Sequence, residues 1–168
     1  MGSQRNFNVA VNELEPYISM PKLITDSIQF VHYPRKSKRS PYGFDQWQSS
    51  YIVSLENQGT IDNLILTLKS SIIYDERYHS FMLGYRYKDV LNIIHQLEVY
   101  PDDYLSHRET DGQQIFGTHI HHLTTTTSCR PDGYHGYTWY QWFDYYRSAV
   151  NLTVTGQIIA PDNGELFI

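Results

Sequence analysis

The sequence contains a single cysteine, Cys129, which excludes a framework of internal disulfides and is typical of proteins in a reducing compartment. It also lacks any apolar run approaching the roughly 20 residues that a membrane-spanning helix needs. The first residues, Met1 to Gln4, do not read as a signal peptide. We therefore expect a cytoplasmic protein with no membrane partner.

An excess of positive charge is missing as well, since the formal net charge is −5. Proteins that coat nucleic acids nonspecifically are usually basic, so direct nucleic-acid binding is the less expected function. The chain has no glycine-rich nucleotide-binding loop, no internal repeat and no linker. Residues 1–168 therefore fit one domain, within which segment 1–20 has no clear pattern.

Aromatic residues are abundant: fifteen tyrosines, seven phenylalanines and three tryptophans favour pleated sheets and contact surfaces. Alternating apolar residues predict strands, and the extended segments expected are 23–33, 51–55, 61–74, 79–87, 90–99, 115–123 and 152–159. Residues 139–150 instead carry apolar residues at helical spacing. The predicted fold class is α+β, a curved antiparallel sheet with one C-terminal helix packed on it.

Two polar segments connect these elements. Residues 101–112 contain Asp111-Gly112, a turn signal for a hairpin. Residues 34–43 read as an exposed loop with four positive charges that are candidates for touching a phosphate backbone, although a solvated loop is the simpler interpretation. These four residues are Arg35, Lys36, Lys38 and Arg39.

The pair His119 and His121 is the strongest chemical signal. On a strand both side chains leave the same face, roughly 7 Å apart, and two imidazoles there can hold a metal ion with His107 or His135 as a third ligand. Three protein ligands plus water is the arrangement of catalytic zinc. A divalent metal ion at His119 and His121 is therefore one candidate cofactor. The alternative is no cofactor, with both histidines bonded to loops and tyrosines.

Two known site types were compared with this pattern. Cupin sites also use His-x-His on a strand, but they take a carboxylate a few residues later, and Thr124 to Ser128 offers none. His122-Leu123-Thr124 has the His-x-Thr form of the two-histidine phosphodiesterases, whose second copy is missing here.

A looser catalytic set remains open. In it, His119 or His121 acts as a base, with His107 nearby and Arg108 or Arg130 holding a phosphate. We expect Tyr137 to lie close to these histidines and arginines.

Residues 85–150 resemble a family of small uncharacterised bacterial and prophage proteins. The resemblance rests on a strand at 91–99, a turn with His107, Asp111 and Gly112, a strand with His119 and His121, and an aromatic helix at 139–146. Thr110, where the family often has proline, and the extra His122 depart from the pattern. The resemblance implies a phage or mobile-element accessory protein acting in the host cytoplasm.

Two functions follow as hypotheses. The preferred one is a binding module that occludes a host protein in the manner of anti-defence inhibitors, such as a nucleic-acid-handling enzyme whose basic groove attracts acidic groups. Its candidate contact residues are Asp102, Asp103, Tyr104, Tyr134, Tyr137 and Tyr140. The alternative is a small nuclease or toxin-like phosphodiesterase, possibly metal-dependent, in which His107, His119, His121 and Arg108 are catalytic. The binding module is preferred because every catalytic set lacks one member in the sequence.

Overall fold

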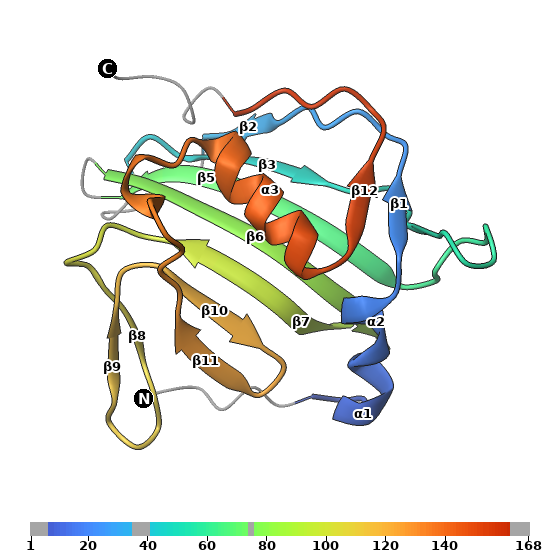
Figure 1. Cartoon of the computed structure of the whole chain (residues 1–168), viewed down its shortest axis with the longest axis horizontal. Helices are drawn as coiled ribbons and strands as arrows, with labels where there is room; N and C mark the ends of the chain where they lie inside the picture. Colours follow the sequence, from blue (N-terminus) through green and yellow to red (C-terminus); the bar gives the residue numbers. More distant parts are fainter. Residues whose placement is uncertain (1–6, 35–40, 74–75, 162–168) are drawn as a thin grey trace.

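The computed structural model describes residues 7–34, 41–73 and 76–161 (Figure 1). The basic positions Arg35, Lys36, Lys38 and Arg39 lie outside the described residues. Within the described part of the chain, no helix is long and apolar enough to span a membrane.

A seven-stranded antiparallel sheet forms the centre of the molecule, with the strand order β11-β10-β7-β6-β5-β3-β2 (Figure 1). Its strands are β2 (Val31–Tyr33), β3 (Phe44–Gln48), β5 (Leu64–Ile73), β6 (Glu76–Tyr87), β7 (Val90–Val99), β10 (His119–His122) and β11 (Thr125–Ser128). The predicted strands at 61–74, 79–87 and 90–99 are confirmed as β5, β6 and β7.

Smaller elements surround this sheet. A three-stranded sheet contains β1 (Lys22–Ile24), β4 (Val53–Ser54) and β12 (Leu152–Val154), and a two-stranded one contains β8 (Leu105–Arg108) and β9 (Gln114–Phe116). Two short helices, α1 (Val11–Leu14) and α2 (Pro16–Ser19), precede β1, and a 3-10 turn, η1 (Tyr134–Gly136), precedes the last helix.

The C-terminal helix α3 (Trp139–Ala149) crosses one face of the sheet (Figure 1). It begins at a capping box in which Thr138 and Gln141 bond each other's backbone N–H groups. Its buried face packs on Phe81 of β6, whose ring centroid lies 5.7 Å from Trp139, 5.9 Å from Phe143 and 5.6 Å from Tyr146. The α+β class with one helix on an antiparallel sheet is therefore confirmed.

The pairing of β7 with β10 divides their residues between two faces. Leu97 pairs with Phe81 on one side and with Ile120 on the other, so all three lie on the face that α3 covers. Glu98 pairs with His119, and because side chains alternate along a strand, both project from the opposite face.

The segment predicted as one strand at 115–123 is two strands, β9 and β10, separated at Gly117. Gly117 has a φ of 72°, and a Cβ there would lie 3.1 Å from the Cα of Asp102, so a side chain is doubly disfavoured. The break lets β9 return along β8, which lies in the segment expected to be a polar connection. The resulting hairpin extends below β10 and β11 in Figure 1.

The turn of this hairpin yields a stability prediction. Gly112 has a φ of 91° and donates its N–H to the Glu109 oxygen at 3.1 Å, while nothing lies within 4 Å of an added Cβ. We expect Gly112→Val to lower the free energy of unfolding by about 1 kcal/mol or more through backbone strain alone. Gly112→Asn, which tolerates positive φ, is the control for chemical denaturation. Equal losses in both variants would contradict the strain explanation.

A second prediction concerns acid stability. His79 is buried on β6 with Nδ1 2.9 Å from the Ser70 hydroxyl, and burial, assisted by the positive charge of Arg77, lowers the pKa of His79 from 6.5 to about 3. Between pH 6.5 and about pH 3, His79 is protonated in the unfolded chain and neutral in the folded chain. The free energy of unfolding should therefore fall by up to about 1.4 kcal/mol per pH unit as the pH drops.

The variant His79→Gln keeps a hydrogen-bonding group for Ser70 but has no titrating ring. We expect its midpoint of urea unfolding to depend less steeply on pH than that of the wild type between pH 6.5 and pH 4. Parallel pH curves for the two proteins would show that His79 contributes nothing to the acid sensitivity.

Candidate metal centre

The imidazoles of His119 and His121 lie side by side on β10, and both residues are buried. Their Nδ1 atoms are held by the protein: His119 Nδ1–H donates to the Gly117 carbonyl at 3.3 Å, and His121 Nδ1 lies 3.0 Å from the Thr126 hydroxyl on β11. A carbonyl oxygen can only accept, so neutral His119 carries its proton on Nδ1 and has a lone pair on Nε2. The two Nε2 atoms face each other at 3.1 Å.

The carboxylate of Glu98 completes this group from the neighbouring strand β7. Its Oε2 lies 3.2 Å from His119 Nε2 and 3.3 Å from His121 Nε2. Its Oε1 accepts a hydrogen bond of 2.8 Å from the hydroxyl of Tyr78 on β6. Burial by itself would raise the pKa of Glu98, but the contacts of its two oxygens with His119, His121 and Tyr78 outweigh burial and hold this pKa below its usual range.

Three potential ligand atoms therefore form a triangle with edges of 3.1, 3.2 and 3.3 Å. Ligand atoms about 2.1 Å from a common ion lie about 3.0 Å apart in an octahedral site and about 3.4 Å apart in a tetrahedral one. The edges of the triangle fall between these values, so one transition-metal ion could bind all three atoms.

His107 supplies a third imidazole from the β8–β9 hairpin. One ligand nitrogen from each of His107, His119 and His121 lies within 4.8 Å of the others. The side chain of His107 is 21% exposed and its Nε2 lies 3.4 Å from Glu109 Oε1, whereas the side chain of His119 is fully buried. The predicted convergence of the three histidines is therefore present, and the cluster faces solvent on the side of the hairpin.

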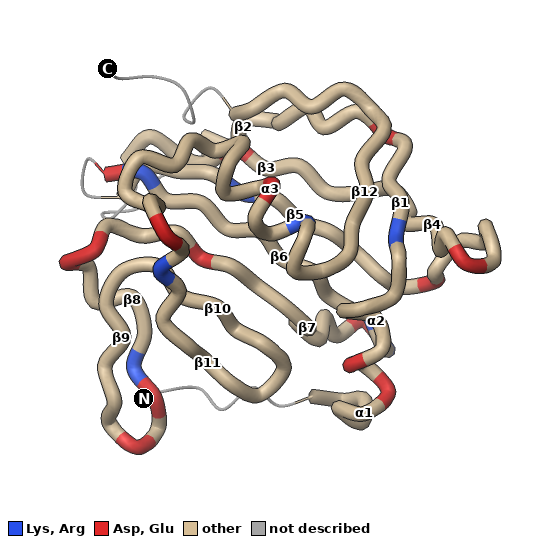
Figure 2. Tube along the Cα trace, in the orientation of Figure 1, with Lys and Arg blue, Asp and Glu red and all other residues tan. Residues whose placement is uncertain are grey.

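Acidic residues surround this hairpin (Figure 2). Residues 101–117 contain the four acids Asp102, Asp103, Glu109 and Asp111 against one base, Arg108. An excess of negative charge on one side of the cluster raises the local concentration of cations.

Other predicted members of the site lie elsewhere. His135, the alternative third ligand, is 72% exposed and has its Nδ1 3.2 Å from Asp102 Oδ2. Arg108 is exposed and follows His107 on β8, so its side chain leaves the strand on the other side. Arg130 is exposed and lies near Tyr134, next to η1. Of the two alternative third ligands, His107 therefore lies in the cluster and His135 does not. Arg130 lies beside Tyr134, and a role for Arg108 stays a prediction.

Glu98 is the member that sequence reasoning missed. The cupin pattern predicts a carboxylate between Thr124 and Ser128, whereas the carboxylate beside the His-x-His strand comes from β7, which precedes it in the chain. Its signal in the sequence is that Glu98 is the one acid in the strand predicted at 90–99. Only the pairing of the strands reveals which residue it faces.

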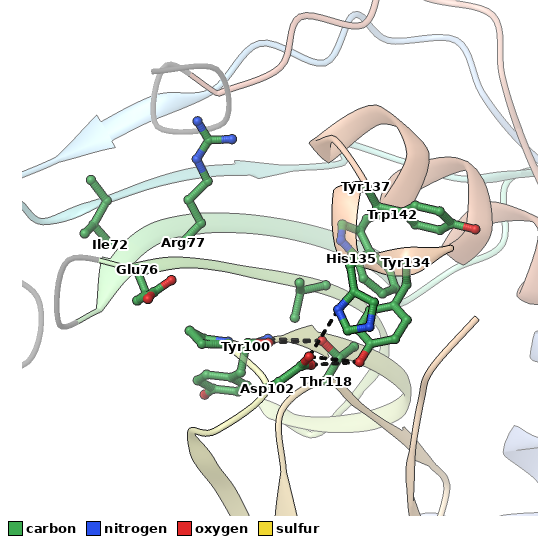
Figure 3. Close-up of a pocket in the computed structure, with 12 residues that line it drawn as sticks. Ile72, Glu76, Arg77, Tyr100, Asp102, Thr118, Tyr134, His135, Tyr137 and Trp142 are labelled. Atoms are coloured by element: carbon green, nitrogen blue, oxygen red, sulfur yellow. Dashed lines mark hydrogen bonds and ion pairs between the residues drawn. The ribbon is translucent and has the colours of Figure 1, made fainter. Parts of the chain in front are cut away.

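The predicted contact residues Asp102, Tyr134 and Tyr137 lie together around a pocket of about 410 Å³ beside η1 and α3 (Figure 3). The Tyr134 hydroxyl donates to both Asp102 oxygens at 3.0 Å. Tyr104 stacks at 4.8 Å on Tyr100, which lines the same pocket. Asp103 is exposed, and Tyr140 accepts a hydrogen bond from the Ala160 N–H at 3.1 Å. Three of the predicted contact residues thus line one pocket, and Tyr104 adjoins it.

No family model, no curated protein and no solved structure matches this chain. The resemblance of residues 85–150 to prophage proteins therefore stays a prediction, and the case for a function rests on the geometry of the cluster.

Proposed function

We propose that this protein is a metal-dependent enzyme with one divalent transition-metal ion bound by His107, His119, His121 and Glu98. The observation that carries the proposal is the triangle formed by the two Nε2 atoms and Glu98 Oε2, with edges of 3.1 to 3.3 Å. Imidazole nitrogen with one carboxylate oxygen is a donor set that suits zinc, iron, cobalt, nickel and copper.

Hydrogen bonds among the three side chains, without a metal ion, explain this triangle less well. A proton on His121 Nε2 satisfies Glu98, but the lone pair of His119 Nε2 still faces the carboxylate at 3.2 Å. A single cation at the centre attracts all three atoms at once.

The histidine nitrogens are supported as metal ligands usually are. Their Nδ1 atoms contact Gly117 and Thr126, which fixes each ring and turns Nε2 toward the centre. The partial exposure of His107 supports access for a substrate from the hairpin side. A divalent ion in such a site lowers the pKa of bound water and polarises a phosphoryl oxygen. These features favour the metal-dependent phosphodiesterase over the binding module as the first function to test.

The direct test is the metal content of untagged protein, measured by inductively coupled plasma mass spectrometry after dialysis. We expect near-stoichiometric zinc, manganese, iron, cobalt, nickel or copper in the wild type and less than about a tenth of it in the double variant His119→Ala, His121→Ala. His135→Ala removes an exposed histidine outside the cluster and should keep the metal.

Wild-type protein that stays empty when offered each of these ions in turn would overturn the proposal. Equal metal content in the double variant and the wild type would show that the ion binds at another site.

Activity gives a separate prediction. Metal-loaded protein should hydrolyse the model phosphodiester bis(p-nitrophenyl) phosphate, and Glu98→Gln should lower kcat/KM by about 100-fold or more because it removes a charged ligand. Arg130→Gln, outside the cluster, should change the rate little. A fully loaded wild type that is inert toward this ester and toward nucleic acids would refute the phosphodiesterase assignment while leaving the metal centre intact.

The binding module remains the second candidate. Asp102, Tyr134 and Tyr137 support it because they line the pocket in Figure 3, where aromatic rings and a carboxylate adjoin. It ranks second because Asp103 and Tyr140 are not among the residues that line this pocket.

A further inference from the structure

We infer that the metal centre keeps an exchangeable coordination position for a small anion, and that the hydroxyl of Tyr78 keeps this position open. The inference rests on the proposed metal centre and concerns how Glu98 binds the ion.

The two carboxylate oxygens of Glu98 have different partners, and one of these partners is Tyr78. Its hydroxyl donates to Oε1 at 2.8 Å, while Oε2 lies 3.2 and 3.3 Å from the Nε2 atoms of His119 and His121. A carboxylate oxygen that accepts a strong hydrogen bond is a weaker metal ligand than the oxygen beside it, so the hydroxyl of Tyr78 favours binding through Oε2. Glu98 therefore binds through one oxygen.

Packing fixes the position of Tyr78. The residue is buried, and its ring lies 4.7 Å from the ring of Tyr100. Tyr100 in turn stacks on His119 with an interplanar angle of 7° and on Tyr104 with an angle of 4°. The hydroxyl and one of the metal-binding imidazoles are thus held by the same group of rings.

The number of protein ligands determines how many coordination positions remain for an added anion. Three imidazole nitrogens and one oxygen fill four positions, so a five-coordinate ion has one left, whereas a bidentate Glu98 would leave none. The side chains of Glu98 and His107 are 16% and 21% exposed, while those of His119 and His121 are 0% and 6% exposed. The remaining position suits a small anion such as azide, hydroxide or a phosphoryl oxygen, which would enter where Glu98 and His107 are exposed.

The experiment uses Co²⁺-loaded protein, because the visible absorption of Co²⁺ reports its coordination number. Azide is titrated into the wild type, Tyr78→Phe and Tyr104→Phe. We expect saturable azide binding in the wild type, and in Tyr78→Phe a changed Co²⁺ spectrum with azide affinity at least about tenfold weaker, since the released Glu98 oxygen competes for the position. Tyr104→Phe alters the same group of rings but not the hydroxyl on Glu98, and it should match the wild type.

A second measurement needs no Tyr78 variant. The infrared difference spectrum between Co²⁺-loaded and metal-free wild type should contain the widely separated carboxylate stretches of one-oxygen binding, and these should disappear in Glu98→Gln. Closely spaced, two-oxygen stretches would overturn the inference even if Tyr78→Phe failed to fold.

The other outcomes separate the two proposals. A wild type that binds Co²⁺ but not azide, or equal azide affinities in the wild type and Tyr78→Phe, overturns the inference and leaves the metal centre standing. A wild type that binds no Co²⁺ or any other tested ion overturns the proposed function itself.

Discussion

The antiparallel pairing of β7 with β10 is the constraint on which the candidate site depends. Leu97 and Ile120 face each other on the side that α3 covers, so burial of their apolar side chains fixes the register. That register places Glu98 opposite His119 on the other side. A slip of one residue would turn both histidines into the aromatic core under α3. The packing of the core and the chemistry of the site are thus set by the same contact.

The cluster is expensive to bury. A carboxylate and two imidazoles lie largely out of water, and in an apolar interior such groups cost free energy unless each is paired. The surrounding hydroxyls and carbonyls offset part of this cost, because Tyr78, Thr126 and Gly117 each contact one member. What remains is two imidazole nitrogens and one carboxylate oxygen that face one another. Polar side chains that stay buried at a cost in stability are typical of functional sites.

The regular elements with strong periodicity were predicted well. The strand at 90–99 coincides with β7, and the helix expected at 139–150 is α3, which ends one residue earlier at Ala149. β3 and β11 were missed because Phe44–Gln48 and Thr125–Ser128 are mostly polar, and their pairing comes from neighbouring strands instead of an apolar alternation of their own. β8 was missed for the same reason.

For the site, the sequence by itself determined that His119 and His121 share a face, since a spacing of two on a strand has that consequence in any fold. It also determined that Asp111-Gly112 turns the chain, because glycine tolerates the positive φ that this turn requires. It left His107 and His135 as equal candidates. In the tertiary structure the hairpin that follows from the turn at Gly117 places His107, and not His135, beside the two histidines. The pairing of β7 with its neighbours places Glu98 and Tyr78 there. Spacing along one strand is a local property of the chain, whereas a metal site is closed by residues from several strands, and their neighbours are decided by the packing of the whole sheet.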